Sequence, residues 1–385
     1  MRHLKLFLSL IAWSALLLTT GSCDSDGLDY PYAPVSQGNI EALVLNEGGF
    51  TTNQASLSVL NKDGSVIPDV FRQTNNRPMG DVGQSITLIN GRYFVALNNS
   101  KKIEVIDPAT FRSTGTILYA QAGFPRQIVP ITDDEAIVSD QYNQLVRIRT
   151  REPYGEPTEY ISIPFGIEYM AVIGRKLFGI TTSGLYVFDT DRINKADARV
   201  IGEVKNSEMT KTCRLLTDKH GKLWALMHVT DDRRVTAIRL ACVNPQTETV
   251  EKNFELPLNL QENPQPGDAT EAVSYNRTDI DPTGTWIYFH AKTCRQAEDG
   301  GATAVQAVWR MNVDTGKFEC HRLLPGTGMM YGFAVSPDGE VYLCDCLDYT
   351  AQRGYIRKYL TDGNIQSYRV GIYPCQVFFP RQTNP

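Results

Sequence analysis

The sequence predicts an all-β chain folded as a seven-bladed β-propeller. The first observation is a hairpin signal at 331–346, where a Ser-Pro-Asp-Gly turn at 336–339 separates two β-rich runs. Proline fixes φ, aspartate hydrogen-bonds its own backbone and glycine accepts positive φ, so this order of residues favours a tight turn. The second observation is that similar hairpins recur at steps of about 40 to 60 residues, the spacing expected of propeller blades. The third is that helical periodicity is nearly absent.

Each blade should contribute one innermost strand. The predicted innermost strands are 85–89, 127–131, 169–173, 213–217, 276–281, 332–336 and 373–379. The N-terminal segment contains three predicted strands, 40–45, 56–61 and 66–71, but no innermost one. We therefore expect the C-terminal strand to pair into this N-terminal blade and close the ring, which leaves only short, protected sheet edges.

Residues 1–22 predict a cleaved signal peptide. Arg2 and Lys5 precede an apolar run at 6–18 that is too short to span a membrane and ends in small residues. Cys23 follows directly, and small residues before a cysteine resemble a bacterial lipobox, so Cys23 is the expected lipidation site. The alternative is an ordinary signal peptide followed by an incidental cysteine.

Residues 23–38 predict the lipidated cysteine with a flexible acidic tether, and residues 39–385 predict the propeller. Asp24, Asp26 and Asp29 resemble the acidic export signal of surface lipoproteins in the Bacteroidetes group. We therefore expect an outer-membrane protein that is held by its lipid anchor alone and faces the cell surface. A periplasmic tether is the alternative.

Composition and cysteines narrow the possible partners. The chain has 38 basic and 43 acidic residues and no pronounced basic run, which argues against nucleic acid as a partner. An exported chain can form disulfides, and Cys294 and the pair Cys344 and Cys346 occupy similar places in neighbouring repeats, so one bond is expected between them. Cys213 and Cys375 are expected as buried thiols. The cysteine spacing does not match a zinc site.

Catalytic motifs are absent from the sequence. It has no nucleophile elbow, P-loop, dinucleotide fingerprint or His-Glu-x-x-His motif. We therefore expect neither an enzyme nor a catalytic cofactor or metal. His228 and His290 each follow a predicted second strand, so both should reach one face of the ring, either as ligand contacts or as unrelated loop residues.

The candidate ligand-binding residues lie in loops that follow second strands or lead into innermost strands, and these two sets of loops share one face of a propeller. They are Phe50, Arg77, Met79, Asn98, Asn99, Asp140, Tyr142, Tyr169, Met209, His228, His290, Tyr331, Asp345 and Tyr373. Aromatic rings can bury an apolar plate and amides can pair with a polar rim, so the mixture suits a large plate-like ligand. The alternative is that the Asn and Asp residues serve turns and the methionines serve the core.

Three patches carry a resemblance to a known family: VLNEGGF at 44–50, RPMGDVGQS at 77–85 and NNSKKIEVID at 98–107. They resemble the YncE-like propeller lipoproteins of Bacteroidetes gut bacteria, and the likeness extends over about residues 40 to 380. That group includes the BtuG-type surface proteins, which bind vitamin B12. The resemblance implies a ligand, cobalamin or a related corrinoid, and a partner, a TonB-dependent outer-membrane transporter that receives it. The loops at 229–234, 261–270 and 295–303 match no pattern of the group.

Two other functions remain open from the sequence. A surface propeller could bind glycans or proteins through a flat aromatic platform. A propeller hydrolase could hold a metal ion in the channel, for which Glu47, Asp140 and Asp345 are the candidate ligands.

Overall fold

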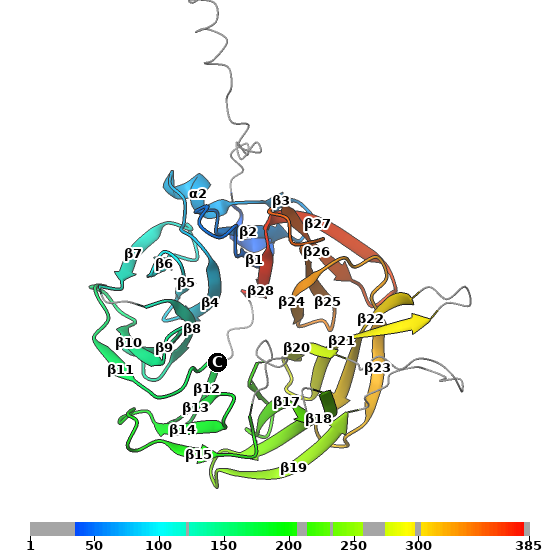
Figure 1. Cartoon of the computed structure of the whole chain (residues 1–385). Helices are drawn as coiled ribbons and strands as arrows, with labels where there is room; N and C mark the ends of the chain where they lie inside the picture. Colours follow the sequence, from blue (N-terminus) through cyan, green and yellow to red (C-terminus); the bar gives the residue numbers. More distant parts are fainter. Residues whose placement is uncertain are drawn as a thin grey trace, which may run out of the picture. The chain divides into compact units, whose positions relative to one another are not determined.

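The computed structural model contains seven four-stranded antiparallel sheets arranged around a central channel (Figure 1). It describes residues 35–120, 123–205, 214–231, 234–256, 274–296 and 302–380. The predicted all-β, seven-bladed propeller is therefore confirmed. No helix in these described segments is long and apolar enough to cross a membrane.

Each blade is a four-stranded meander. From the innermost strand outwards, the sheets are β4 (Gly83–Ile89), β5 (Arg92–Leu97), β6 (Lys102–Ile106) and β7 (Ser113–Leu118); β8 (Pro125–Pro130), β9 (Glu135–Asp140), β10 (Gln144–Arg149) and β11 (Glu159–Ser162); β12 (Tyr169–Ile173), β13 (Lys176–Ile180), β14 (Leu185–Asp189) and β15 (Arg199–Ile201); β16 (Leu216–Thr217), β17 (Leu223–Asp231), β18 (Arg234–Asn244) and β19 (Thr249–Leu256); β20 (Ser274–Ile280), β21 (Trp286–Gln296), β22 (Ala302–Asn312) and β23 (Phe318–Leu323); β24 (Met330–Val335), β25 (Val341–Asp345), β26 (Arg353–Tyr359) and β27 (Ile365–Ile372); and β28 (Pro374–Phe378), β1 (Ile40–Asn46), β2 (Ser56–Asn61) and β3 (Val66–Ile67).

The innermost hairpins turn where the sequence predicts. Gly339 and Gly284 adopt φ of +79° and +67° in the turns after β24 and β20, a backbone region that glycine enters without steric cost. Gly284 also lies against the neighbouring blade, where a Cβ would come within 2.5 Å of the Lys219 backbone nitrogen. The glycine therefore serves both the turn and the contact between blades.

The ring closes as predicted, through pairing of the two ends of the chain. Strand β28 pairs antiparallel with β1, with Val377 opposite Val44 and Phe378 opposite Leu43. The ring of Phe378 also contacts the Tyr93 ring in the next blade, with centroids 5.5 Å apart. The C-terminal strand thus ties the N-terminal blade to its neighbour.

The core lies between neighbouring blades. One cluster joins the first two blades through buried residues such as Phe94, Ile103, Ile128 and Val138, and similar clusters fill the later junctions. Apolar side chains that alternate along each strand interlock with those of the next sheet. This packing makes the ring a rigid frame for its channel.

One element differs from the prediction. The segment expected as an outer strand at 66–71 is a two-residue strand, β3, followed by the short helix α2 (Val70–Asn75). The Asp69 side chain caps this helix by accepting a hydrogen bond from the Arg72 amide at 3.0 Å, and Asn76 ends it with φ of +51°. A one-turn 3-10 helix, η1 (Gln37–Asn39), precedes β1.

The expected disulfide between Cys294 and Cys344 or Cys346 is wrong. Cys344 and Cys346 are both buried free thiols. Cys344 packs into the cluster that joins the sixth and seventh blades, and the Cys346 thiol faces the Pro374 carbonyl. Both thiols therefore turn away from the fifth blade, which carries the backbone of residue 294. The side chain of Cys294, the residue Cys213 and the expected lipidation site Cys23 lie outside the described residues.

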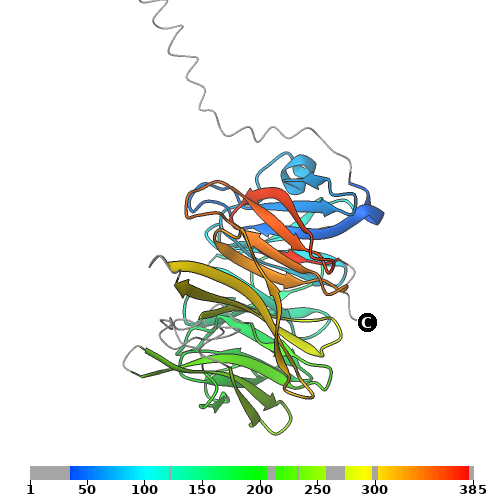
Figure 2. The ribbon, with the colours of Figure 1, turned by 90° about the vertical axis from the view of Figure 1, so that its right-hand side faces the viewer.

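Two hairpins are longer than the others. Strands β17 and β18, and likewise β21 and β22, extend beyond their blades on the same side of the ring, as the lime-green and the yellow-to-gold strands in Figure 2 show. This is the side on which second strands end and innermost strands begin. The long hairpins therefore flank one opening of the channel, which we call the channel mouth.

Candidate functional site

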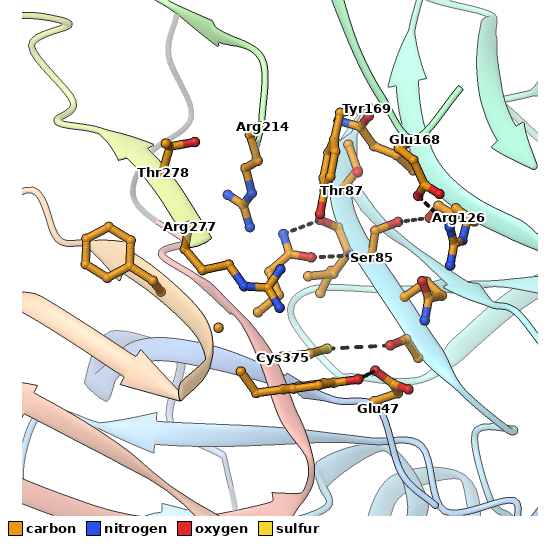
Figure 3. A pocket seen from close by; sticks show the side chains of 18 residues that line it. Glu47, Ser85, Thr87, Arg126, Glu168, Tyr169, Arg214, Arg277, Thr278 and Cys375 are labelled. Carbon is orange, nitrogen blue, oxygen red and sulfur yellow. Dashed lines mark hydrogen bonds and ion pairs between the residues drawn. The ribbon is translucent and has the colours of Figure 1, made fainter. Parts of the chain in front are cut away.

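A cavity of about 440 Å³ occupies the central channel near its mouth (Figure 3). Its walls are the first residues of the innermost strands, because successive blades bring these strand starts together around the axis. Five charged side chains and two tyrosines give it its chemical character. They are Arg126, Arg214, Arg277, Glu47, Glu168, Tyr169 and Tyr331.

Glutamine side chains bridge neighbouring innermost strands at the cavity wall. Gln376 accepts a hydrogen bond from the Ile86 amide at 3.1 Å and donates one to the carbonyl of the same residue at 3.3 Å. Gln127 makes the same pair of bonds to Met170. Ser85 adds a third bridge by donating to the Arg126 carbonyl. These polar groups are already satisfied, so they hold the frame of the cavity rather than reach for a ligand.

A second polar contact joins the sixth and seventh blades. The Tyr331 hydroxyl donates to the Glu47 carboxylate at 2.6 Å. Burial raises the pKa of the Glu47 carboxyl, and the Tyr331 hydrogen bond with nearby Arg126 and Arg277 opposes this shift. The Arg277 guanidinium lies 5.9 Å from the centroid of the Tyr331 ring.

The three cavity arginines differ in how they are paired. Arg126 forms an ion pair with Glu168 at 2.5 Å. Arg214 and Arg277 point into the cavity (Figure 3), and neither forms an ion pair or hydrogen bond with another side chain of the described residues. Their guanidinium N–H groups are thus the principal donors that the described cavity leaves open.

The same segments were compared with known protein families. Residues 41–299 match the model of a family described as "Domain of unknown function (DUF5074)". The chain belongs to the DUF5074 family. The comparison with curated proteins found no significant match.

Solved structures similar to this DUF5074 chain share its fold. A candidate 6-phosphogluconolactonase from Bacteroides fragilis matches with a TM-score of 0.60 and 10% identity, over 90% of this chain and 99% of the other. A second candidate 6-phosphogluconolactonase, from Bacteroides uniformis, has a TM-score of 0.59 and 11% identity over 89% and 99%. At these identities the likeness concerns the fold alone. It fits a YncE-like propeller.

The structure brings five of the predicted site residues to the mouth side of the DUF5074 propeller. Tyr169 and Tyr331 line the cavity itself. Phe50 and Tyr142 follow second strands, and their side chains are 71% and 49% exposed. Tyr373 leads into β28, its ring lies 6.0 Å from that of Tyr331, and its hydroxyl donates to the Tyr349 carbonyl.

The predicted amide-rich rim is instead tied into the backbone. Asn98 donates to the Pro125 carbonyl, and Asp140 accepts hydrogen bonds from the Phe124 and Tyr142 amides. Asp345 is fully buried and accepts from the Gly328 and Leu347 amides and from the Arg357 guanidinium. These side chains fix the loops and do not line the cavity.

Three further candidates lie within the first blade and its loops. Asn99 donates to the Asp81 carboxylate, and Met79 is completely buried in the core. Arg77 forms an ion pair at 2.6 Å with the fully buried Glu104. None of them lines the cavity, because each is held by contacts within its own blade. Met209 lies outside the described residues.

Both candidate histidines are buried. His290 lies 3.0 Å from the Gln306 side-chain oxygen, through its Nε2 atom. His228 is 6% exposed, and neither of its ring nitrogens has a hydrogen-bond partner among the described residues. Burial lowers the pKa of His228 to about 4. Neither histidine lines the cavity.

We expect His228 to make the stability of the propeller depend on pH. Its pKa of about 4 in the folded chain lies below the usual value of 6.5, so the unfolded chain binds a proton first as the pH falls. The stability that His228 gives above pH 6.5 should be lost between pH 6.5 and 4, by up to about 3 kcal/mol. Urea unfolding across this range measures the loss.

His228→Gln should reduce this pH dependence by roughly half, because burial also lowers the pKa of His321 to about 4. The control is His220→Gln, since His220 lies in an exposed turn beside Asp314. An unchanged pH profile in the His228 variant would contradict the prediction.

The search for a metal site and for missed residues gives two results. No group of three or more His, Cys, Asp or Glu side chains in the described segments could hold a metal ion. Sequence reasoning missed Arg214 and Arg277. Their signal was present, since each precedes a turn aspartate, Asp218 or Asp281, by the same interval.

Proposed function

We propose that this DUF5074 propeller is a non-enzymatic surface lipoprotein that captures cobalamin or a related corrinoid at the channel mouth. It then passes the ligand to a TonB-dependent outer-membrane transporter. The observation that carries the proposal is the aromatic mouth above a polar cavity. Tyr169 and Tyr331 line the cavity, and Phe50 and Tyr142 lie exposed on the same side.

A corrinoid would lie across this mouth rather than inside it. The macrocycle with its side chains and nucleotide loop is larger than a cavity of about 440 Å³ can enclose. Aromatic side chains can bury the apolar faces of the ring, while one polar substituent enters the cavity. The ligand identity is further supported by the three sequence patches that resemble the YncE-like lipoproteins.

Capture requires no catalytic group. It requires a preformed concave surface, because a rigid site loses little conformational entropy on binding. The glutamine bridges from Gln127 and Gln376 fix neighbouring innermost strands at the cavity wall. In this proposal the anchor at Cys23 keeps the propeller beside the transporter that accepts the ligand.

The test is isothermal titration of residues 24–385 with cyanocobalamin. We expect saturable one-to-one binding, and about tenfold weaker binding for Tyr169→Ala, since an aromatic contact contributes about 1.4 kcal/mol. Tyr368→Ala is the matched control, because Tyr368 lies on outer strand β27 with its hydroxyl bonded to Gln366.

Absence of binding, checked by an unshifted visible spectrum of the corrinoid, would overturn the proposal. A surface propeller for glycans or proteins would then take precedence. The exposed side chains of Phe50 and Tyr349, 71% and 84% accessible, would supply its contact surface.

A further inference from the structure

We infer that Arg214 and Arg277 form an oxyanion subsite in the central cavity, which takes a phosphate or carboxylate group of the ligand. The inference rests on the proposed function in treating this cavity as the place where the ligand enters. It goes further by naming the chemical group that the channel recognises and the residues that recognise it.

The two arginines come from adjacent blades. Arg214 stands just before β16 and Arg277 lies within β20, and these innermost strands contact each other. Both side chains extend into the same cavity (Figure 3). A small anion between them could therefore receive hydrogen bonds from two blades at once.

The acidic groups around the cavity are already engaged. The Glu168 carboxylate pairs with Arg126, and the Glu47 carboxylate accepts from the Tyr331 hydroxyl. The third acid, Asp279, attracts Arg214 electrostatically but spends one carboxylate oxygen on the Val335 amide at 2.9 Å. None of the three acids forms an ion pair with Arg214 or Arg277 within the described structure.

Guanidinium groups with open donors favour oxyanions over other ligands. Each carries five N–H donors in a planar fork whose spacing matches two oxygens of a phosphate or carboxylate. Guanidinium is also weakly hydrated, so it loses little when a ligand displaces its water. The Tyr331 ring beside Arg277 holds that guanidinium from one side.

This arrangement divides ligand recognition between two depths. Aromatic side chains at the mouth contact an apolar ring and are indifferent to charge. The arginine pair below them selects an anionic substituent, which in cobalamin is the phosphodiester of the nucleotide loop. Cobinamide has the same macrocycle but lacks this phosphodiester, so it separates the two contributions.

The probes for the subsite are inorganic phosphate and acetate, titrated separately into residues 24–385. This form contains the whole compact unit that begins at residue 35. We expect saturable phosphate binding that weakens at least tenfold in Arg214→Gln and in Arg277→Gln. The matched control is Arg239→Gln, because Arg239 pairs with Glu255 on the outer strands. Acetate binding with equal loss in the variants would identify a carboxylate as the preferred group.

The corrinoid experiment distinguishes this inference from the proposed function. We expect cobinamide to bind at least tenfold more weakly than cyanocobalamin, and Arg277→Gln to remove most of that difference. If both corrinoids bind equally and neither anion binds, the subsite is wrong and capture stands. If phosphate binds through the arginines but no corrinoid does, the subsite stands and the capture proposal is wrong. Arg277→Lys retains the charge, so it provides a second variant should Arg277→Gln fail to give the melting temperature of the unmodified chain.

Discussion

A chain that ends at Tyr373 is expected to lose the cooperative unfolding transition of the propeller. The truncation removes β28, so β1 loses its inner neighbour and the ring stays open. It also removes Val377 and Phe379 from the cluster that joins the sixth and seventh blades. Loss of one buried Phe alone costs about 3 to 5 kcal/mol, and whole domains are stable by only about 5 to 15 kcal/mol.

Scanning calorimetry and size-exclusion chromatography measure this effect. The control is a chain that ends at Pro380, which keeps the complete strand and should unfold like the full chain. A truncated chain that shows the same transition temperature as this control would mean that ring closure contributes little to stability.

Asp345→Ala should lower the free energy of unfolding by about 3 kcal/mol, because it removes one partner of a buried ion pair and two backbone hydrogen bonds. The Asp345 carboxylate is fully buried, and the Arg357 guanidinium contacts it at 2.5 Å. The Gly328 and Leu347 amides lose their acceptor in the same substitution. Urea unfolding at pH 7 gives the difference directly.

A surface pair provides the matched control for Asp345. Glu255→Ala breaks the exposed ion pair with Arg239 and should cost less than about 1 kcal/mol. Corrinoid affinity should change in neither variant, since neither residue lines the cavity. A loss of affinity without a loss of stability in Asp345→Ala would instead make Asp345 a ligand contact.

The architecture could be predicted from the sequence because its signals are local and repeated. The turns at Gly284 and Gly339 carry glycine where positive φ is needed, and the repeat of such turns sets the number of blades. The unpaired run at the C-terminus then had one place to go. The helix α2 was missed because Val70 and Phe71 continue an apolar run, although Asp69 and Asn76 carry the cap signals of a helix.

The site was predicted less well because side-chain direction within a loop is a tertiary property. The loops at the mouth were identified correctly, but Asp140 and Asp345 turn back to satisfy backbone amides. The disulfide failed for a related reason. Successive strand residues point to opposite faces, so similar positions in two repeats do not place Cys344 opposite the fifth blade. The pairing of Arg126, which leaves Arg214 and Arg277 open, depends on which blades meet across the channel.

The pairing of Leu43 with Phe378 also determines when the molecule can exist at all. A chain emerging from a ribosome or an export channel presents β1 first, and its partner arrives last. Until then the edge of β1 offers unpaired backbone groups to any neighbouring strand, which is a route to aggregation. Contacts between such distant residues also slow folding. The last strand is therefore a checkpoint for completeness, since a chain that stops a few residues short has made nearly the whole protein and still has no ring.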